Sequence, residues 1–320
     1  MPTLARRYDR TMSFFAILCA LLAEQVRPLP SGSAAREGVR MWADWISRNV
    51  DAGRRQSAGL AWTLGAGIPT LAAMTVHALL DWSLGWPVAV VWNVAVLYLT
   101  LGFRQFSHPF TEIREALETG DEELARSLLA RWRRIDPLDL PRSEVLRQVI
   151  EHSVLSAHRH VFGVLAWYAA LAAFGLGPAG AVLYRMAEFL RRHWGAAPGN
   201  SEVHLETASA ALQQISRDMW QRIDWVPARV TALGFAVVGS FEDAIDGWRR
   251  QANERPGDND GLMLSATAGA LNVRLGTAQD LAHWREPQLG HLAQLVGLVW
   301  RSVVVWMLLL ALLTLAHLLG

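Results

Sequence analysis

Two long stretches of this sequence carry no charged side chain, and they limit what the chain can fold into. One covers residues 57–80, and the other, Ser83–Phe103, begins just after Asp81. An α-helix rises about 1.5 Å per residue, so about 20 apolar residues cross the hydrocarbon core of a bilayer. We therefore expect each stretch to span a membrane, with a third span at Ser302–Gly320. The alternative is a pair of helices buried in the core of a soluble protein.

The composition agrees with a membrane protein and excludes several classes of site. Hydrophobic residues make up 52% of the chain and charged residues 18%, and all 30 cationic residues are arginine. Without lysine, neither a Walker P-loop nor a pyridoxal-phosphate Schiff base can form. The single cysteine, Cys19, excludes an internal disulfide and every cysteine-paired zinc site. A net charge of +1 supplies no field that would attract nucleic acid, so no nucleic-acid partner is expected.

The distribution of arginine predicts how the chain is oriented. Residues 27–56 contain six arginines and residues 104–160 contain nine, and these segments flank the 57–103 hairpin. Because arginine-rich loops stay in the cytoplasm, both flanks are predicted to be cytoplasmic. This indicates a multi-pass protein of the bacterial inner (cytoplasmic) membrane, with the lipid bilayer as a partner. Met12–Ala23 is apolar but short, which predicts an N-terminal anchor, and Met12 is a second candidate start codon.

The middle of the sequence predicts shorter helices. The apolar run at 161–190 is interrupted at Gly175–Pro178, which favours two half-helices that enter the membrane and return, with one continuous span as the alternative. Val230–Gly239 and Leu262–Val273 are too short to span alone and are expected to be protein-buried or interfacial. Thr111–Arg134 predicts two helices with a turn at Gly120 and Asp121. Pro141 starts another helix, which runs to about His160.

The expected fold is all-α: a multi-pass helical membrane protein with cytoplasmic helical segments. Its predicted parts are an N-terminal anchor and transmembrane hairpin (1–103), a cytoplasmic helical segment (104–160), a re-entrant and half-buried helical core (161–300) and a C-terminal transmembrane helix (301–320).

Several polar groups are candidates for chemistry, and each also has a structural interpretation. His152, His158 and His160 suggest either a metal site or, preferably, a polar helix end. Asp121 and the two glutamates after it fit the start of a helix. The acidic turn Gly257–Gly261 lacks the downstream glutamate of a calcium loop.

The run from Asp224 to Arg229 is the most interesting of these groups. A carboxylate, an arginine and Pro227 at the mouth of a short apolar helix could form a polar pocket at the membrane surface. The alternative is a helix-starting proline with an interfacial tryptophan and a local ion pair.

Several short motifs follow one another along the chain in a characteristic order. They are Gly120-Asp121, Ile150-Glu151, Gly177-Pro178 through Leu183-Tyr184-Arg185, Pro227-Ala228-Arg229, and Asn259 followed by Ala268-Gly269-Ala270-Leu271 and Leu275-Gly276. Their order and spacing resemble the CobD/CbiB superfamily, the membrane proteins of cobalamin biosynthesis, from about Met12 onward. The resemblance implies an activity that joins an aminopropanol-type side arm to a corrin carboxylate as an amide, giving an adenosylcobinamide-type product.

The resemblance also implies a site. A corrinoid is the implied substrate, and no cofactor or metal site is predicted. The catalytic candidates are Asp136, Glu151 and Asp224, and the ligand-binding candidates are Arg159, Arg229 and Asn259. They are expected to surround a pocket that faces the cytoplasm.

The chain departs from the family pattern at several polar positions. The family's Glu-Asn-Thr-Val-Asp-Gly motif falls on His158–Gly163, its Asn-Thr-Leu-Asp motif falls on Glu188–Arg191, and a C-terminal carboxylate falls on Leu264. Leucine and phenylalanine can neither bind a metal nor move a proton. These replacements put the family's catalysis in doubt.

Two functions therefore stay open. One is an amide-forming corrinoid side-arm synthase. The other is a non-catalytic membrane signalling modulator or scaffold that acts through a protein partner. The second function follows from a similarity to AmpE, carried by Arg159 to Trp167, Gly175 to Pro178 and Asp224 to Arg229.

Overall fold

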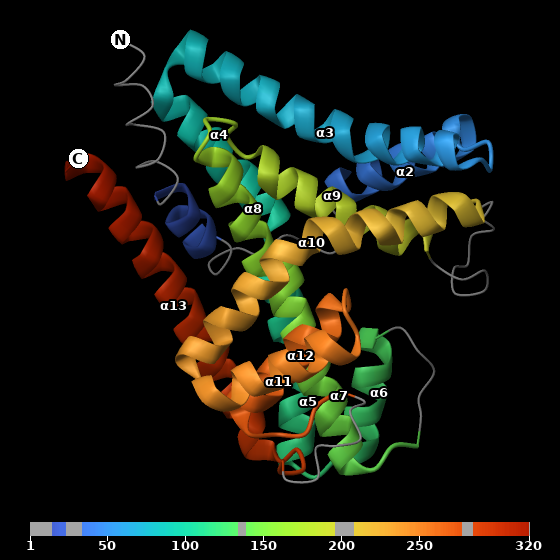
Figure 1. The fold of residues 1–320 in the computed structure, drawn as a ribbon, viewed down its shortest axis with the longest axis vertical. Helices are drawn as coiled ribbons and strands as arrows, with labels where there is room; N and C mark the ends of the chain where they lie inside the picture. Colours follow the sequence, from blue (N-terminus) through green and yellow to red (C-terminus); the bar gives the residue numbers. More distant parts are fainter. Residues whose placement is uncertain (1–14, 24–33, 134–138, 196–207, 277–283, 320) are drawn as a thin grey trace. The chain divides into compact units, whose positions relative to one another are not determined.

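The computed structural model describes residues 15–23, 34–133, 139–195, 208–276 and 284–319, and Figure 1 shows their arrangement within each part of the chain. These residues form helices and no strand, with one isolated bridge between Val273 and Arg285. The all-α prediction is confirmed. Besides a short helix at 15–23, the helices are α2 (Ala34–Val50), α3 (Arg55–Leu84), α4 (Trp86–Thr100), α5 (Phe103–Glu118), α6 (Glu122–Arg133), α7 (Arg142–Ala157), a π-helical turn (His158–Phe162), α8 (Gly163–Ala172), α9 (Ala179–Trp194), α10 (Ala210–Val238), α11 (Phe241–Glu254), α12 (Asn259–Leu271) and α13 (Leu289–Leu319).

The chain divides into two compact units. Unit 1 comprises Met1–Leu101, Gly163–Asp224 and Leu313–Gly320, and unit 2 comprises Gly102–Phe162 and Trp225–Leu312. Each unit is therefore assembled from segments that are far apart in the sequence, and each is described by itself below.

Unit 1 contains an apolar core in which α2, α3, α9 and α10 meet. Its buried side chains are Ala43, Ile46, Ala58, Ala61, Ala66, Met186, Leu190, Trp194, Leu212 and Ile215. The buried residues that α3 contributes to this core are alanines. Their small side chains let the larger side chains of α9 approach the backbone of α3. Polar contacts border this core, because His193 Nε2 lies 2.6 Å from Asp44 Oδ1, and Ser209 Oγ donates to Asp51 Oδ1 at 2.9 Å.

Two prolines lie inside long helices, and near each of them a tryptophan from another helix supplies the hydrogen bond that the proline removes. Proline has no backbone N–H, so Pro69 in α3 leaves the carbonyl of Gly65, four residues earlier, without its helical donor. The indole Nε1 of Trp42 in α2 donates to that carbonyl at 3.2 Å. In the same way, Pro227 in α10 removes the helical donor of Ile223 O, and Trp167 Nε1 donates to it at 3.0 Å. Both helices thus pass through a proline without an unsatisfied carbonyl.

The long α10 corrects one sequence-based expectation. Neither the predicted short helix at Val230–Gly239 nor a helix that begins at Pro227 is present, because α10 runs without a break from Ala210 to Val238. Pro227 is an interior proline, tolerated since an indole replaces the lost N–H, so Asp224 lies within a helix rather than at the mouth of one.

The predicted spans are confirmed only in part. Two described helices are long and apolar enough to cross a membrane: α3 and residues Leu289–Leu312 of α13. The expected span at Ser83–Phe103 is shorter than predicted, since α4 covers only 15 residues, about 22 Å against the 30 Å of a bilayer core. Gly85, with φ 82°, separates it from α3, and extended backbone at Leu101 ends it. The third predicted span is part of a longer helix, in which Arg301 is an interior residue.

The Gly/Pro break in the central apolar run is a turn between two helices. The α8 and α9 helices pack against each other on either side of residues 173–178, where Gly175 and Gly177 have positive φ values of 77° and 55°. The sequence-based prediction of two helices around this break is confirmed, and their insertion in a membrane stays a prediction.

Unit 2 is built from helical pairs (Figure 1). The α5 and α6 helices pair around Gly120, as predicted, and Asp121 Oδ1 caps α6 by accepting from Leu124 N at 3.0 Å. The α11 and α12 helices pack so closely that a Cβ added at Gly269 would lie 2.2 Å from the carbonyl oxygen of Asp243. The expected buried helix at Leu262–Val273 is α12, and Asp258 caps it by accepting from Gly261 N at 2.9 Å.

We predict that the Trp42 indole and Pro69 are energetically coupled. Trp42→Phe leaves a carbonyl unsatisfied and should destabilise the protein by about 1–3 kcal/mol. In a Pro69→Ala background the restored N–H satisfies Gly65 O, so the same substitution should cost clearly less. Thermal unfolding of the four proteins in detergent micelles measures this double-mutant cycle. Trp82→Phe, at a side chain that is 86% exposed, is the control. An equal cost of Trp42→Phe in both backgrounds would contradict the coupling.

Candidate functional site

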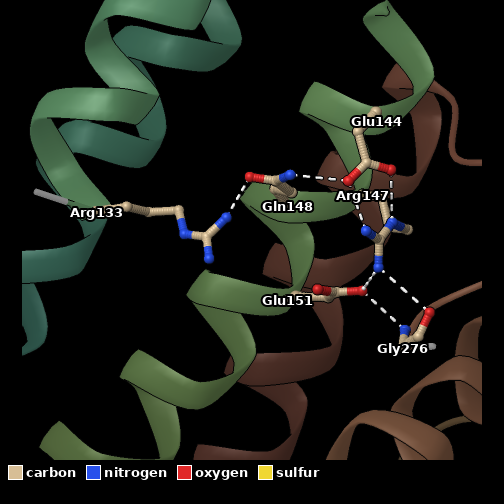
Figure 2. Close-up of polar contacts among 6 residues, drawn as sticks. All are labelled: Arg133, Glu144, Arg147, Gln148, Glu151 and Gly276. Carbon is tan, nitrogen blue, oxygen red and sulfur yellow. Dashed lines mark hydrogen bonds and ion pairs between the residues drawn. The ribbon is translucent and has the colours of Figure 1, made fainter. Parts of the chain in front are cut away.

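A polar clamp in unit 2 joins α7 to the segment that follows α12 (Figure 2). Glu151 Oε1 accepts a hydrogen bond from Arg147 Nη1 at 2.6 Å and from the backbone N–H of Gly276 at 2.7 Å. Arg147 Nη1 also donates to the carbonyl of Gly276 at 3.2 Å. Both backbone polar groups of Gly276 are thus held by side chains that lie one helical turn apart on α7.

The clamp is extended along α7 by Glu144 and Gln148. Arg147 donates to both carboxylate oxygens of Glu144, through Nε at 2.8 Å and through Nη2 at 2.5 Å. This pairing lowers the pKa of Glu144 and raises the pKa of Arg147 from their ordinary values. Gln148 Nε2 donates to Glu144 Oε1 at 2.8 Å, and Arg133 of α6 donates to Gln148 Oε1. Figure 2 shows Arg133 reaching this group from the neighbouring helix.

His152 lies on the same helix in a different environment. Its ring packs edge-on against the indole of Trp132, with the ring centroids 4.4 Å apart. Burial, reinforced by the nearby positive charges of Arg133 and Arg159, lowers the pKa of His152 to about 4. This histidine is therefore neutral at physiological pH. The predicted helix end near His160 is wrong, because α7 continues through the π-helical turn into α8 and His152 is an interior residue of α7.

A second polar cluster lies at the first turn of α12, and we call it the α12 cluster: Arg159, Arg229, Asn259 and Asp260. Arg229 Nη1 donates to Asn259 Oδ1 at 3.1 Å, and its guanidinium carbon lies 4.0 Å from the ring centroid of Trp225. Arg159, in the π-helical turn, donates to Asp260. Three ligand-binding candidates are thus brought to one helix terminus. Guanidinium forks beside a helix N-terminus are suited to a carboxylate or phosphate group.

The other histidines of this region point to separate partners. His158 is fully buried, with Nδ1 3.0 Å from Thr231 Oγ1, and His160 Nδ1 lies 2.9 Å from the carbonyl of Ser156. Across the described part of the chain, no three His, Cys, Asp or Glu side chains are grouped to hold a metal ion. Phe162, where the family pattern has an aspartate, is fully buried and packs edge-on against Phe235.

Asp224 belongs to unit 1 and is also buried. The hydroxyl of Tyr184 donates to Asp224 Oδ1 at 2.7 Å, and neither side chain is exposed. One turn further along α9, the buried Glu188 accepts from Arg192 Nη2 at 3.0 Å. Sequence reasoning missed Tyr184 and Glu188 as functional candidates. Their spacing of four residues on an otherwise apolar helix face was the available signal.

The predicted site residues therefore fall into three groups. Arg159, Arg229 and Asn259 form the α12 cluster, and Glu151 lies in the clamp, where its Oε1 is committed to structural hydrogen bonds. Asp224 belongs to unit 1. Asp136 lies outside the described residues. Sequence reasoning also missed Arg147, and it noted Gly276 only as part of a family motif; folding brings the two residues together.

We predict that His152 makes the protein less stable at acidic pH. The unfolded chain protonates this histidine near its ordinary pKa of 6.5, whereas the folded protein resists protonation down to about pH 4. Stability should therefore fall as the pH drops below about 6.5, by roughly 2 kcal/mol at pH 5.

Thermal unfolding of wild type and His152→Gln at pH 7.5 and pH 5 tests this prediction. The variant should lose less stability between the two values. His108→Gln, at a side chain that is 61% exposed, serves as the control. A pH dependence that His152→Gln leaves unchanged would rule out this histidine as its source.

Comparison with known proteins identifies the family. A family profile described as CobD/Cbib protein matches residues 17–297. The cobalamin biosynthesis protein CobD of Stutzerimonas stutzeri is 30% identical over 309 residues, which cover 93% of this chain and 96% of the relative. The protein of the same name from Chromobacterium violaceum is 32% identical over 227 residues, or 68% of this chain and 69% of the relative. No solved structure matches at a significant level.

The profile and these relatives support the CobD/CbiB resemblance of the sequence, and the likeness to AmpE stays a prediction. The match includes both the α7 clamp and the α12 cluster, which lie within residues 17–297. Because it covers most of its length, this chain belongs to the CobD/CbiB family.

Proposed function

We propose that this protein acts in cobalamin biosynthesis, as a membrane protein that forms the amide between a corrin carboxylate and an aminopropanol-type side arm. The observation that carries the proposal is the 30% identity to a cobalamin biosynthesis protein over 93% of the chain. A bacterial inner-membrane location, with α3 and α13 as spanning helices, belongs to the same proposal. The two long apolar helices support it.

The α12 cluster supports a role for unit 2 in binding an anionic group. A carboxylate does not react with an amine until it is activated, for example when a nucleoside triphosphate transfers a phosphoryl group to it and forms an acyl phosphate, from which the amine then displaces phosphate. Both the carboxylate and the phosphate are anions that arginine binds through two parallel hydrogen bonds. In this proposal Arg229 binds the anion, Trp225 and Asn259 orient its guanidinium, and Arg159, through its ion pair with Asp260, holds the first turn of α12.

The clamp has a supporting role in this proposal. Arg147 and Glu151 hold Gly276 after the C-terminal end of α12, while Arg159 holds Asp260 at its N-terminal end. Holding α12 at both ends fixes the position of Asn259 relative to α7. Glu151 would then act as a positioning residue and not as an acid or base.

A variant series in a cobalamin-auxotrophic strain that lacks its membrane synthase tests the function. Wild type should restore growth, and membrane fractions should convert a corrinoid carboxylate into its aminopropanol amide. Arg229→Gln should lower kcat/KM by roughly tenfold to a hundredfold, because it removes a charge-assisted hydrogen bond. Arg249→Gln, at an exposed position of α11, should have wild-type activity.

Failure of well-expressed wild-type protein to restore growth or to form the amide would exclude the synthase and favour the non-catalytic modulator. Equal activity of Arg229→Gln and wild type would keep the pathway assignment but remove the α12 cluster from the reaction.

The proposed membrane orientation predicts the labelling of single cysteines. With Cys19→Ser as the background, Ser83→Cys at the tip of the α3–α4 hairpin should react with a membrane-impermeant maleimide added to spheroplasts. Ser143→Cys, in the first turn of α7, should react only after the membrane is permeabilised. These expectations follow from arginine-rich segments on the cytoplasmic side and from a hairpin in which α3 crosses the membrane and α4 with its flanking residues returns. Labelling of both positions from the same side would contradict this return.

A further inference from the structure

Two polar side chains are buried inside the apolar α3–α4 hairpin of unit 1. His77 in α3 is 4% exposed, and Asn93 in α4 is 5% exposed. His77 Nδ1 and Asn93 Oδ1 have no hydrogen-bond partner among the residues that the structure describes. Leaving such atoms unsatisfied in apolar surroundings costs free energy, so each requires an explanation.

The two residues are equally far in sequence from the turn of the hairpin, so we expect the antiparallel pairing of α3 and α4 to bring them to the same level. His77 precedes Gly85, which separates the helices, by eight residues, and Asn93 follows it by eight. His77 shares the buried stripe of α3 with Ala73, and Asn93 shares the buried stripe of α4 with Ala89. The helices touch in this region, because Trp92 Nε1 donates to the carbonyl of Ala73 at 3.2 Å.

The turn before α9 closes the third side of this region. A Cβ added at Gly177 would lie 2.3 Å from Cγ and 2.8 Å from Nδ1 of His77, so the backbone passes directly beside the unpartnered nitrogen. Gly177 has a φ of 55°, a conformation that other residues rarely adopt. The ring is thus enclosed by α3, by α4 and by the α8–α9 turn.

The chemistry of the two atoms limits what could bind there. Asn93 Oδ1 can only accept a hydrogen bond, and His77 Nδ1 accepts or donates according to its tautomer. The nearest carboxylate along α3, Asp81, is exposed, so nothing on this helix offers a buried counter-charge for a cation. A small neutral molecule with at least one O–H group fits these requirements.

We propose that the α3–α4 hairpin contains a binding site for one water molecule, which bridges His77 Nδ1 and Asn93 Oδ1. The water donates to the asparagine and completes the hydrogen bonding of the histidine in either tautomer. Buried waters in proteins occupy such positions, between otherwise unsatisfied polar groups. The bridge ties α3 to α4 beside the α8–α9 turn and does not depend on the proposed function.

A double-mutant cycle tests the coupling through the water. His77→Phe and Asn93→Leu each leave one polar atom without its bridge, so each should lower the thermal unfolding midpoint by several degrees. The double variant removes both polar atoms and should lower the midpoint by less than the sum of the two losses. His108→Phe, at an exposed histidine of α5, is the control. Strictly additive losses would overturn the proposal.

Nuclear magnetic resonance of the folded protein measures the contact of the His77 ring with water directly. In protein with 15N-labelled histidine, the His77 ring is assigned as the signal missing from His77→Phe. Magnetisation transfer from water to this ring, and a change of its Nδ1 shift in Asn93→Leu, are the expected results. No transfer from water, or a direct hydrogen bond from Asn93 to His77, would overturn the proposal.

Discussion

The structure depends on satisfying hydrogen-bonding groups within an unusually apolar chain. Backbone carbonyls that prolines deprive of their donors would be expensive to leave unpaired in such surroundings. At Pro69 and Pro227 the indoles of Trp42 and Trp167 donate to the carbonyls in question, Gly65 O and Ile223 O. Each indole belongs to a helix other than the one that contains the proline. The same hydrogen bond therefore satisfies the free carbonyl and joins the two helices. This gives two of the 15 tryptophans a role that composition alone does not show.

The polar residues of unit 2 follow the same principle with charged groups. Arg147 is shared between Glu144, Glu151 and the carbonyl of Gly276, so the carboxylates and the chain after α12 are stabilised together. In the α12 cluster, by contrast, Arg229 donates to the neutral side chain of Asn259 and stacks on the ring of Trp225. A guanidinium held in this way is suited to binding an anionic ligand.

The residues onto which the sequence analysis placed the family's acidic motif take part in the packing of the fold. His158 pairs with Thr231, and Phe162 packs against Phe235 in a fully buried position. Family membership and the α12 cluster favour a corrinoid-linked enzyme, while these replacements are the reason that activity has to be measured.

Local sequence determined the helices, because apolar spacing and punctuation act over a few residues. It predicted the all-α class, the turn at Gly120, the break before α9 and the start of α7 at Pro141, and it singled out three of the four residues of the α12 cluster. It predicted too long a helix at α4 and too short a helix at α10. Residue type alone sets neither the length of α4 nor whether a helix continues through Pro227. Only the tertiary structure decided those points. Trp167 satisfies the carbonyl that Pro227 exposes, and Gly276 reaches Glu151 from 125 residues away. Such contacts depend on which helices fold side by side, and no local pattern encodes that.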